Sequence, residues 1–193
     1  MRLLIKKRTD PLELRYSHSQ EQLIADCKRG DRQAQFKLYK LYAKAMYNTA
    51  LRIVSDADEA ADVLQEAFVD AFKRLESFRE ESTFGLWMKQ IVVNKSLSAL
   101  RKRKVIFESI DDQNDRYADM SQDPEEENSL LFKVEQIKRA IDQLPDGYRI
   151  VLSLYLLEVY DHEEIAHILK ISENTSRTQF LRAKRKLLEL IQN

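Results

Sequence analysis

Hydrophobic residues recur along most of this chain at steps of mainly three and four, which is the period of an amphipathic α-helix. In the first part of the chain the pattern predicts a helix after Ser19 that stops at Gly30, a second after Asp31, and a third after the acidic turn 55–58. Ser19 with Gln22 fits a capping box, and Asp31 fits an N-cap. The faces expected to be buried contain Leu23 and Ile24, then Phe36, Tyr39, Ala43, Met46, Tyr47, Ala50, Leu51 and Val54, then Ala60, Val63, Leu64, Ala67, Phe68, Ala71, Phe72 and Leu75.

The fourth predicted helix follows a short loop, residues 78–83, and separates apolar from basic positions. Its inward positions are Phe84, Trp87, Met88, Ile91, Val92, Leu97 and Leu100, and its outward positions are Lys89, Asn94, Lys95, Arg101 and Arg103. The loop adds aromatic, basic and hydroxyl side chains. Because cations follow phosphates and aromatic or polar pockets take unstacked bases, the segment predicts a single-stranded nucleic-acid interface. A core helix with a solvated basic face is the alternative.

The third predicted helix carries an outward acidic face formed by Asp62, Gln65, Glu66, Val69 and Asp70. Acid–base catalysis by such carboxylates needs a pocket and contrasting environments, and no histidine lies near them in sequence. The pattern therefore favours a surface that docks on another protein, with a plain solvated face as the alternative.

The composition changes abruptly at residues 106–128, where Arg116 is the only basic residue among many acidic ones and Pro124 interrupts the run. This composition predicts a flexible acidic linker. We therefore expect an all-α chain with two small helical domains, at 19–105 and 129–193. Residues 1–18 lack a clear period, and we expect a poorly ordered N-terminal extension.

The C-terminal domain begins with two predicted helices, which bury Leu131, Val134, Ile137, Ala140, Ile141 and Leu144, and then Ile150, Val151, Leu154 and Leu157. A short helix capped by Asp161 and Glu164 follows, then a turn at 170–172 and a longer helix with basic residues. This order is typical of a helix-turn-helix, whose second helix enters the DNA major groove. The alternative is a helical hairpin with a charged surface.

The second helix of that motif divides into two faces. Ser176, Phe180, Ala183, Leu187 and Leu190 are expected to face inward, and Arg177, Thr178, Leu181, Arg182 and Arg185 are expected to face DNA. His162 and His167 are close in sequence but have no third ligand beside them, so no metal site is predicted.

Charged residues make up 33% of the 193 residues, with three glycines and three prolines, which is typical of a largely helical protein. Basic and acidic residues number 32 each, so affinity for a polyanion must come from local patches. The single cysteine, Cys27, and the absence of a recognisable signal peptide or membrane span lead us to expect a cytoplasmic protein. No nucleophile–base pair, phosphate loop or metal cluster is recognisable, so we expect no enzymatic activity, cofactor or small-molecule substrate.

Four segments resemble, in order and spacing, the extracytoplasmic-function (ECF) group of bacterial sigma factors: D-E-A-A-D-V-L-Q-E-A-F-V-D-A-F-K-R-L, F-R-E-E-S-T-F-G-L-W-M-K-Q-I-V-V-N-K, L-P-D-G-Y-R-I-V and E-E-I-A-H-I-L-K-I-S-E-N-T. The resemblance covers residues 20–191. It implies a transcription initiation factor that docks on core RNA polymerase and binds promoter DNA.

The resemblance implies three functional surfaces. The helix with Asp62, Gln65, Glu66 and Val69 would dock on the clamp helices of the largest polymerase subunit. The minus-ten element, as a melted strand with a flipped base, would contact Phe78, Arg79, Ser82, Thr83, Phe84, Lys89, Asn94, Lys95 and Arg101. The C-terminal domain would contact the polymerase flap and read the minus-thirty-five duplex through Asn174, Arg177, Thr178, Leu181, Arg182 and Arg185.

The resemblance also implies a separate anti-sigma factor as partner, often membrane-bound, and a linker that runs through the polymerase cleft and RNA exit channel. The chain departs from the family pattern where Glu80 and Lys170 replace common glycines, Ser98 a common Asp, and Ser176 a common buried Val. These departures leave the promoter sequence open. The rival hypotheses are a one-component helix-turn-helix regulator, which would bind duplex DNA tightly without polymerase, and a polymerase adaptor that does not bind DNA.

Overall fold

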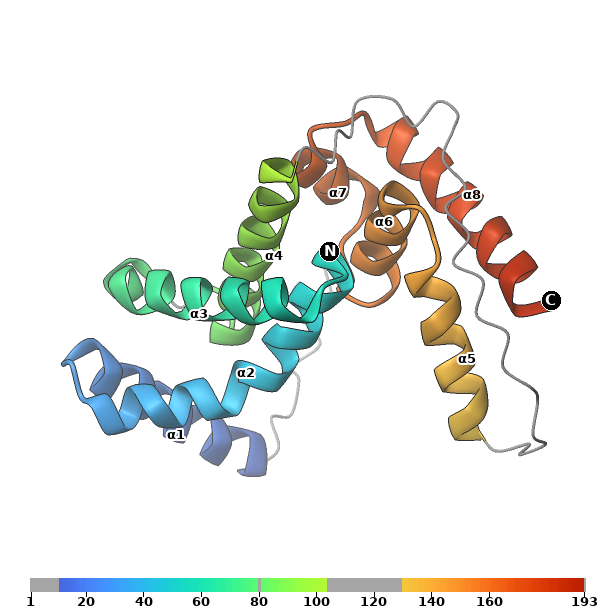
Figure 1. Ribbon diagram of the computed structural model, residues 1–193. Coiled ribbons are helices and arrows are strands. Elements are labelled where there is room, and N and C mark those ends of the chain that lie inside the picture. The colour runs from blue at the N-terminus through green and yellow to red at the C-terminus, as the bar shows by residue number, and fades with distance from the viewer. Residues whose placement is uncertain (1–10, 80, 104–129, 193) are drawn as a thin grey trace, which may run out of the picture.

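The computed structural model describes residues 11–79, 81–103 and 130–192, which form helices joined by short turns (Figure 1). The helices are α1 (Pro11–Lys28), α2 (Arg32–Val54), α3 (Ala57–Lys73), α4 (Phe84–Lys102), α5 (Leu130–Asp142), α6 (Asp146–Leu156), α7 (His162–Leu169) and α8 (Glu173–Gln192), with a 3-10 turn at Leu75–Ser77. No strand occurs in these ranges, and the predicted all-α class is confirmed. The predicted linker, 106–128, lies outside the described residues.

Side-chain caps set several of the helix starts. Asp31 accepts hydrogen bonds from the backbone N–H groups of Gln33, at 2.7 Å, and Ala34, at 3.2 Å, as its N-cap role predicts. Thr83 caps α4 by accepting from the N–H of Leu86 at 3.3 Å. At the end of α1, Gly30 takes a left-handed φ of 84°, which confirms the predicted stop.

The predicted capping box at Ser19 is wrong, because α1 begins at Pro11 and continues through Ser19. Proline suits a helix start, since its φ is already helical and the N–H that it lacks would be unpaired there. Residues 11–18, expected to be poorly ordered, are therefore helical, whereas residues 1–10 lie outside the described part of the chain.

Helices α2, α3 and α4 pack against one another through the predicted apolar faces. Among the largest fully buried side chains are Leu38, Ile53, Met88, Leu97 and Leu100, and burying each contributes about 1.5–3 kcal/mol. Close approach of α4 to α2 depends on Gly85, where an added Cβ would lie 3.0 Å from Cε1 of Tyr42.

The predicted burial of Phe36 is wrong, since this side chain is 57% exposed and the Lys40 ammonium lies 4.6 Å from its ring centroid. The inward face of α2 passes through Ala34 and Leu38 instead. In the C-terminal half, α8 packs on α5, α6 and α7. Ile150, Val151 and Leu154 are buried as predicted, and Ile165 of α7 is buried as well.

Val134, Ile137 and Leu157 were expected to be buried but are exposed. They line a shallow groove between α5, α2 and the end of α6, because α5 packs chiefly on α8 and little covers its other side.

The two halves are in contact, since α6 lies against the end of α2 (Figure 1). Ile150, Val151 and Leu154 of α6 belong to the same continuous apolar cluster as the residues buried between α2, α3 and α4. This contact brings the C-terminal half close to the start of α4, which the sequence had linked to single-stranded nucleic acid.

Replacing Lys170 with glycine is expected to stabilise the protein. Lys170 ends α7 with a left-handed φ of 59°, which costs a non-glycine residue about 1–2 kcal/mol. Glycine removes that cost but adds about 0.5–1 kcal/mol of backbone entropy, so K170G should raise the free energy of unfolding by up to about 1 kcal/mol in urea titrations. The control is K184G in the interior of α8, which should lower it by about 1 kcal/mol. A loss of stability in K170G would contradict the assignment.

Candidate nucleic-acid interface

One outward face of α3 combines polar and apolar groups on a rigid helix. Asp62, Gln65, Glu66 and Val69 recur at steps of three and four, so they share one side of α3, and all four are exposed. The opposite side, with Ala60, Ala67 and Ala71, is fully buried against the neighbouring helices. The predicted docking residues therefore form one continuous strip that no described part of the chain covers.

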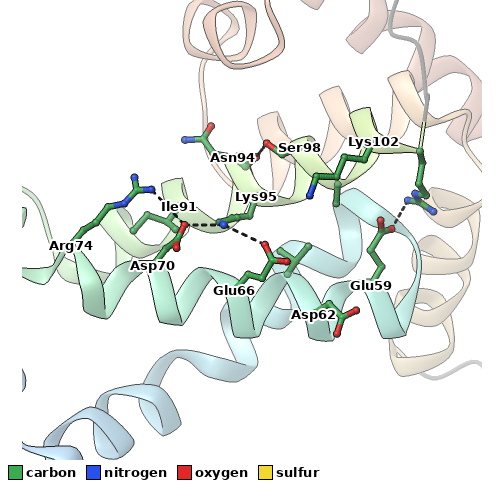
Figure 2. A pocket seen from close by; sticks show the side chains of 13 residues that line it. Glu59, Asp62, Glu66, Asp70, Arg74, Ile91, Asn94, Lys95, Ser98 and Lys102 are labelled. Carbon is green, nitrogen blue, oxygen red and sulfur yellow. Dashed lines mark hydrogen bonds and ion pairs between the residues drawn. The ribbon is translucent and has the colours of Figure 1, made fainter.

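A charged groove runs between α3 and α4 beside this strip (Figure 2). From α4, Lys95 Nζ lies 2.9 Å from the Asp70 carboxylate and 3.3 Å from that of Glu66, both on α3. Further along the groove, Arg103 pairs with Glu59 at 2.8 Å. The α4 cations on this side are thus partly neutralised by α3, whereas Figure 2 shows Asn94 pointing away from the carboxylates.

The hydrogen bond from Lys95 lowers the pKa of Asp70, and the same bond raises the pKa of Lys95. Both groups are therefore charged at neutral pH. Any stability from this pair persists above the unfolded pKa of Asp70 and is lost as the pH falls through its lowered folded pKa. The contribution of this pair to stability is small, because the pair lies at the surface. The sequence pattern predicted that both side chains face outward, and it did not predict the contact between them.

The aromatic side chains of the loop before α4 are part of the core. Phe78 and Phe84 are 4% and 2% exposed, with ring centroids 5.8 Å apart, and Trp87 packs on both. Phe78 and Phe84 are therefore not available to stack on a base in this arrangement. Of the other predicted minus-ten residues, Arg79, Ser82, Thr83, Asn94 and Arg101 are exposed. Glu80 lies outside the described residues.

Lys89, also predicted to face DNA, instead points toward the C-terminal half. Its side chain is 17% exposed, and Nζ donates a hydrogen bond of 2.8 Å to the backbone carbonyl of Glu158. Lys89 and Lys95 are thus both engaged by acidic residues of this chain, and the sequence pattern contained no signal for either contact.

The helix-turn-helix has the predicted geometry. Asp161 and Glu164 form a reciprocal capping box at the start of α7, with hydrogen bonds of 2.8 and 2.9 Å. On α8, Ser176 and Ala183 are buried and Phe180, Leu187 and Leu190 are half-buried, whereas the predicted DNA-facing residues Asn174, Arg177, Thr178, Leu181, Arg182 and Arg185 are all exposed. The second helix therefore presents one continuous basic and polar face.

The sequence pattern did not predict a polar pair inside this motif, formed by His162 and Ser176. Ser176, where the family commonly has Val, is fully buried and hydrogen-bonded to Nδ1 of His162 at 2.9 Å. The imidazole is stacked on Tyr155, with centroids 4.5 Å apart. Burial, followed by the charge of Arg177, lowers the pKa of His162. The pair thus joins the start of α7 to α8 through a neutral histidine.

In the part of the chain that the structure describes, no three His, Cys, Asp or Glu side chains are grouped closely enough to hold a metal ion. Nor does any helix within those residues have the length and apolar character needed to cross a membrane.

Two family models match the chain in the order in which its two halves occur. Sigma-70 region 2 matches residues 38–105, and Sigma-70, region 4 matches residues 134–187. The RNA polymerase sigma-H factor of Pseudomonas aeruginosa is 29% identical over 180 residues, which is 89% of this chain and 93% of the relative. The ECF RNA polymerase sigma-E factor of Escherichia coli is 28% identical, over 84% of this chain and 88% of the relative.

Solved structures share the fold. The sigma factor RpoE of Bartonella quintana, solved with the anti-sigma factor NepR, is 24% identical with a TM-score of 0.55, over 81% of this chain and 95% of that one. CnrH, solved with the cytosolic domain of CnrY, is 21% identical with a TM-score of 0.52, over 88% of this chain and 95% of that one.

Together, the two family models, the relatives and the helical architecture show that the chain belongs to the sigma-70 family of RNA polymerase sigma factors, as a member of the extracytoplasmic-function group. It is a transcription initiation factor and not an enzyme. The resemblance found in the sequence is confirmed.

The helix-turn-helix is expected to lose stability in mild acid through His162. Its pKa is lower in the folded than in the unfolded protein, so the folded state favours the neutral ring. This contribution is complete above the unfolded pKa, about 6.5, and declines as the pH falls below it. Urea unfolding at about pH 7.5 and 5.5 should show a smaller drop in stability for H162Q than for the wild type.

His167, exposed on the same helix, provides the control. H167Q should keep the pH dependence of the wild type. An equal drop in the wild type and H162Q would contradict the role assigned to His162.

Proposed function

We propose that this sigma factor divides promoter recognition between its two halves: the N-terminal half docks on core polymerase and binds the melted minus-ten strand, and the C-terminal half reads the minus-thirty-five duplex. The observation that carries this proposal is the separation of the outward faces. The α3 strip, the α4 surface and the α8 face are distinct and point outward from elements whose other sides are buried.

The α3 strip of Asp62, Gln65, Glu66 and Val69 suits a protein partner. Val69 adds an exposed apolar group at one end of the strip, and the acidic and amide groups beside it complement a basic surface. We assign this strip to the clamp helices of the largest polymerase subunit, and the C-terminal domain to the flap. The Glu66–Lys95 ion pair then links the polymerase contact to α4.

For the minus-ten strand, the exposed residues Arg79, Ser82, Thr83, Asn94 and Arg101 are the direct contacts. Flipping a base costs a few kcal/mol of unstacking, which hydrogen bonds and phosphate contacts from these side chains must offset. Phe78 and Phe84 support the loop from the core, and Lys95 holds α4 against α3. For the minus-thirty-five duplex, Arg177, Thr178, Leu181 and Arg182 reach base edges while Asn174 and Arg185 contact the backbone.

The functional units are 19–105 and 129–193, joined by the acidic linker 106–128 and preceded by the segment 1–18. Because the sigma factor RpoE of Bartonella quintana is described in complex with an anti-sigma factor, we assign this chain an anti-sigma partner that covers its polymerase- and DNA-binding faces. The site of action is the cytoplasm, where promoters and polymerase are present.

The α3 strip predicts a selective loss of polymerase binding. Q65A/E66A removes two exposed side chains, so the far-ultraviolet circular dichroism and urea midpoint should stay close to those of the wild type. Affinity for core polymerase, measured by competition with the wild-type protein, should fall at least about tenfold, as it does when an interface hot spot worth about 2 kcal/mol is truncated. E76A, exposed on the same domain, is the control and should bind normally. Normal binding by Q65A/E66A would refute the docking surface.

The α8 face predicts a change in sequence preference. R182A should cost about 1–3 kcal/mol on the preferred minus-thirty-five sequence and little on mismatched duplexes, as loss of a base contact does. Fluorescence anisotropy of the holoenzyme on matched and mismatched duplexes measures both. R139A, exposed on α5 and therefore off the α8 face, should bind both like the wild type. An equal loss on every sequence would reassign Arg182 to a phosphate contact.

A further inference from the structure

A buried carboxylate from the C-terminal half lies between two helices of the N-terminal half. Glu158 follows α6 and is only 5% exposed. Its Oε1 accepts hydrogen bonds from Thr49 Oγ1, at 3.1 Å, and from the Arg52 guanidinium, both on α2. Its Oε2 lies 3.6 Å from Lys89 Nζ on α4. A buried charge is tolerated only with such partners, so Thr49, Arg52 and Lys89 form a built anion site.

The turn that delivers this carboxylate is strained. Val159, next to Glu158, has a φ of 62° and is 80% exposed. Holding a β-branched residue in this left-handed region destabilises the fold by about 1–2 kcal/mol. Because the Val159 side chain is exposed, its packing offsets little of that free energy. The backbone N–H groups of Glu158 and Tyr160 are held by carbonyls of α6, at 3.0 Å each. The turn therefore keeps an unfavourable conformation that directs Glu158 into the other half.

This contact cannot persist when both promoter elements are bound. The elements lie about 25 base pairs apart, which is roughly 85 Å along duplex DNA at about 3.4 Å per base pair. In this structure Arg149 of α6 donates to the carbonyls of Arg52 and Ile53 at the end of α2, at 3.3 and 3.2 Å. The two halves must separate to reach both elements, and Glu158 then leaves its site.

The emptied site would keep its donors close to the minus-ten surface. A hollow lined by Thr83 and Leu86, at the start of α4, continues to Thr49, Arg52 and Lys89. Arg52 Nε is buried there without a hydrogen-bond partner among the described residues, so the guanidinium has a spare donor. Arginine and lysine together suit the oxygens of a phosphate as well as those of a carboxylate.

We propose that Thr49, Arg52 and Lys89 form an anion site that Glu158 fills while the protein is closed and that a backbone phosphate of the minus-ten strand fills once the halves separate. Glu158 thus excludes single-stranded DNA from the free protein. The inference rests on the proposed function for the identity of the strand, but closure by Glu158 does not depend on it.

Two measurements on the full chain test the proposal. Dyes on cysteines introduced at Glu76 and Glu189, both exposed, report the separation of the halves by energy transfer. Cys27 can stay, because it is buried and burial raises its pKa to about 11, which keeps the thiol unreactive. A fluorescent oligothymidylate of about 15 nucleotides reports strand binding without any choice of promoter sequence.

E158Q leaves Arg52 and Lys89 without a counter-charge, so energy transfer should fall and the oligonucleotide should bind on the order of tenfold more tightly. R52Q/E158Q should stay open, lose most of that gain and show a salt slope smaller by about 0.7 than that of E158Q, the value for one phosphate on single-stranded DNA. E163Q, which removes an exposed carboxylate of α7, should match the wild type in both assays.

Unchanged energy transfer and affinity in E158Q, with circular dichroism like that of the wild type, would overturn the proposal. The proposal would also be overturned if E158Q opened without binding the oligonucleotide more tightly, or if R52Q/E158Q kept the tighter binding of E158Q. If E158Q behaves as expected in both assays but the wild-type protein supports no promoter-specific transcription with core polymerase, the proposed function fails and the anion site stands.

Discussion

The packing of α4 against α2 and α3 holds the outward surfaces of the N-terminal half in place. Met88, Val92, Leu97 and Leu100 are buried in that contact, and Gly85 lets the start of α4 approach Tyr42 closely. Because the inner sides of α3 and α4 are fixed in this way, the outer sides are fixed as well. The exposed strip of α3 and the polar surface of α4 are therefore held in one orientation relative to each other.

Charge within the protein is arranged around this scaffold rather than spread evenly. Equal numbers of acidic and basic residues, 32 each, leave no net attraction to DNA. Lys95 is engaged by α3, and Lys89 and Arg52 are engaged by Glu158. Cations suited to phosphate are thus occupied by carboxylates of the same chain, which leaves fewer of them open to DNA in this arrangement.

The sequence was most informative where structure is local. The cap at Asp31, the stop at Gly30, the capping box of α7 and the two faces of α3 and α8 depend on neighbours within a few residues, and all were predicted. It was least informative where distant segments meet. The pairing of Lys95 with Asp70, the burial of Phe78 and the insertion of Glu158 between α2 and α4 leave no periodic signal. The DNA-facing surface of α4 was therefore predicted to be larger than the structure makes it.

Run-off transcription measures whether this protein directs core polymerase to specific promoters. Purified core polymerase would transcribe a pool of genomic fragments with and without the protein. We expect new transcripts whose start sites share paired upstream elements about 25 base pairs apart, and no stable binding of those fragments by the protein alone. Unchanged transcription, together with tight duplex binding by the protein alone, would contradict it.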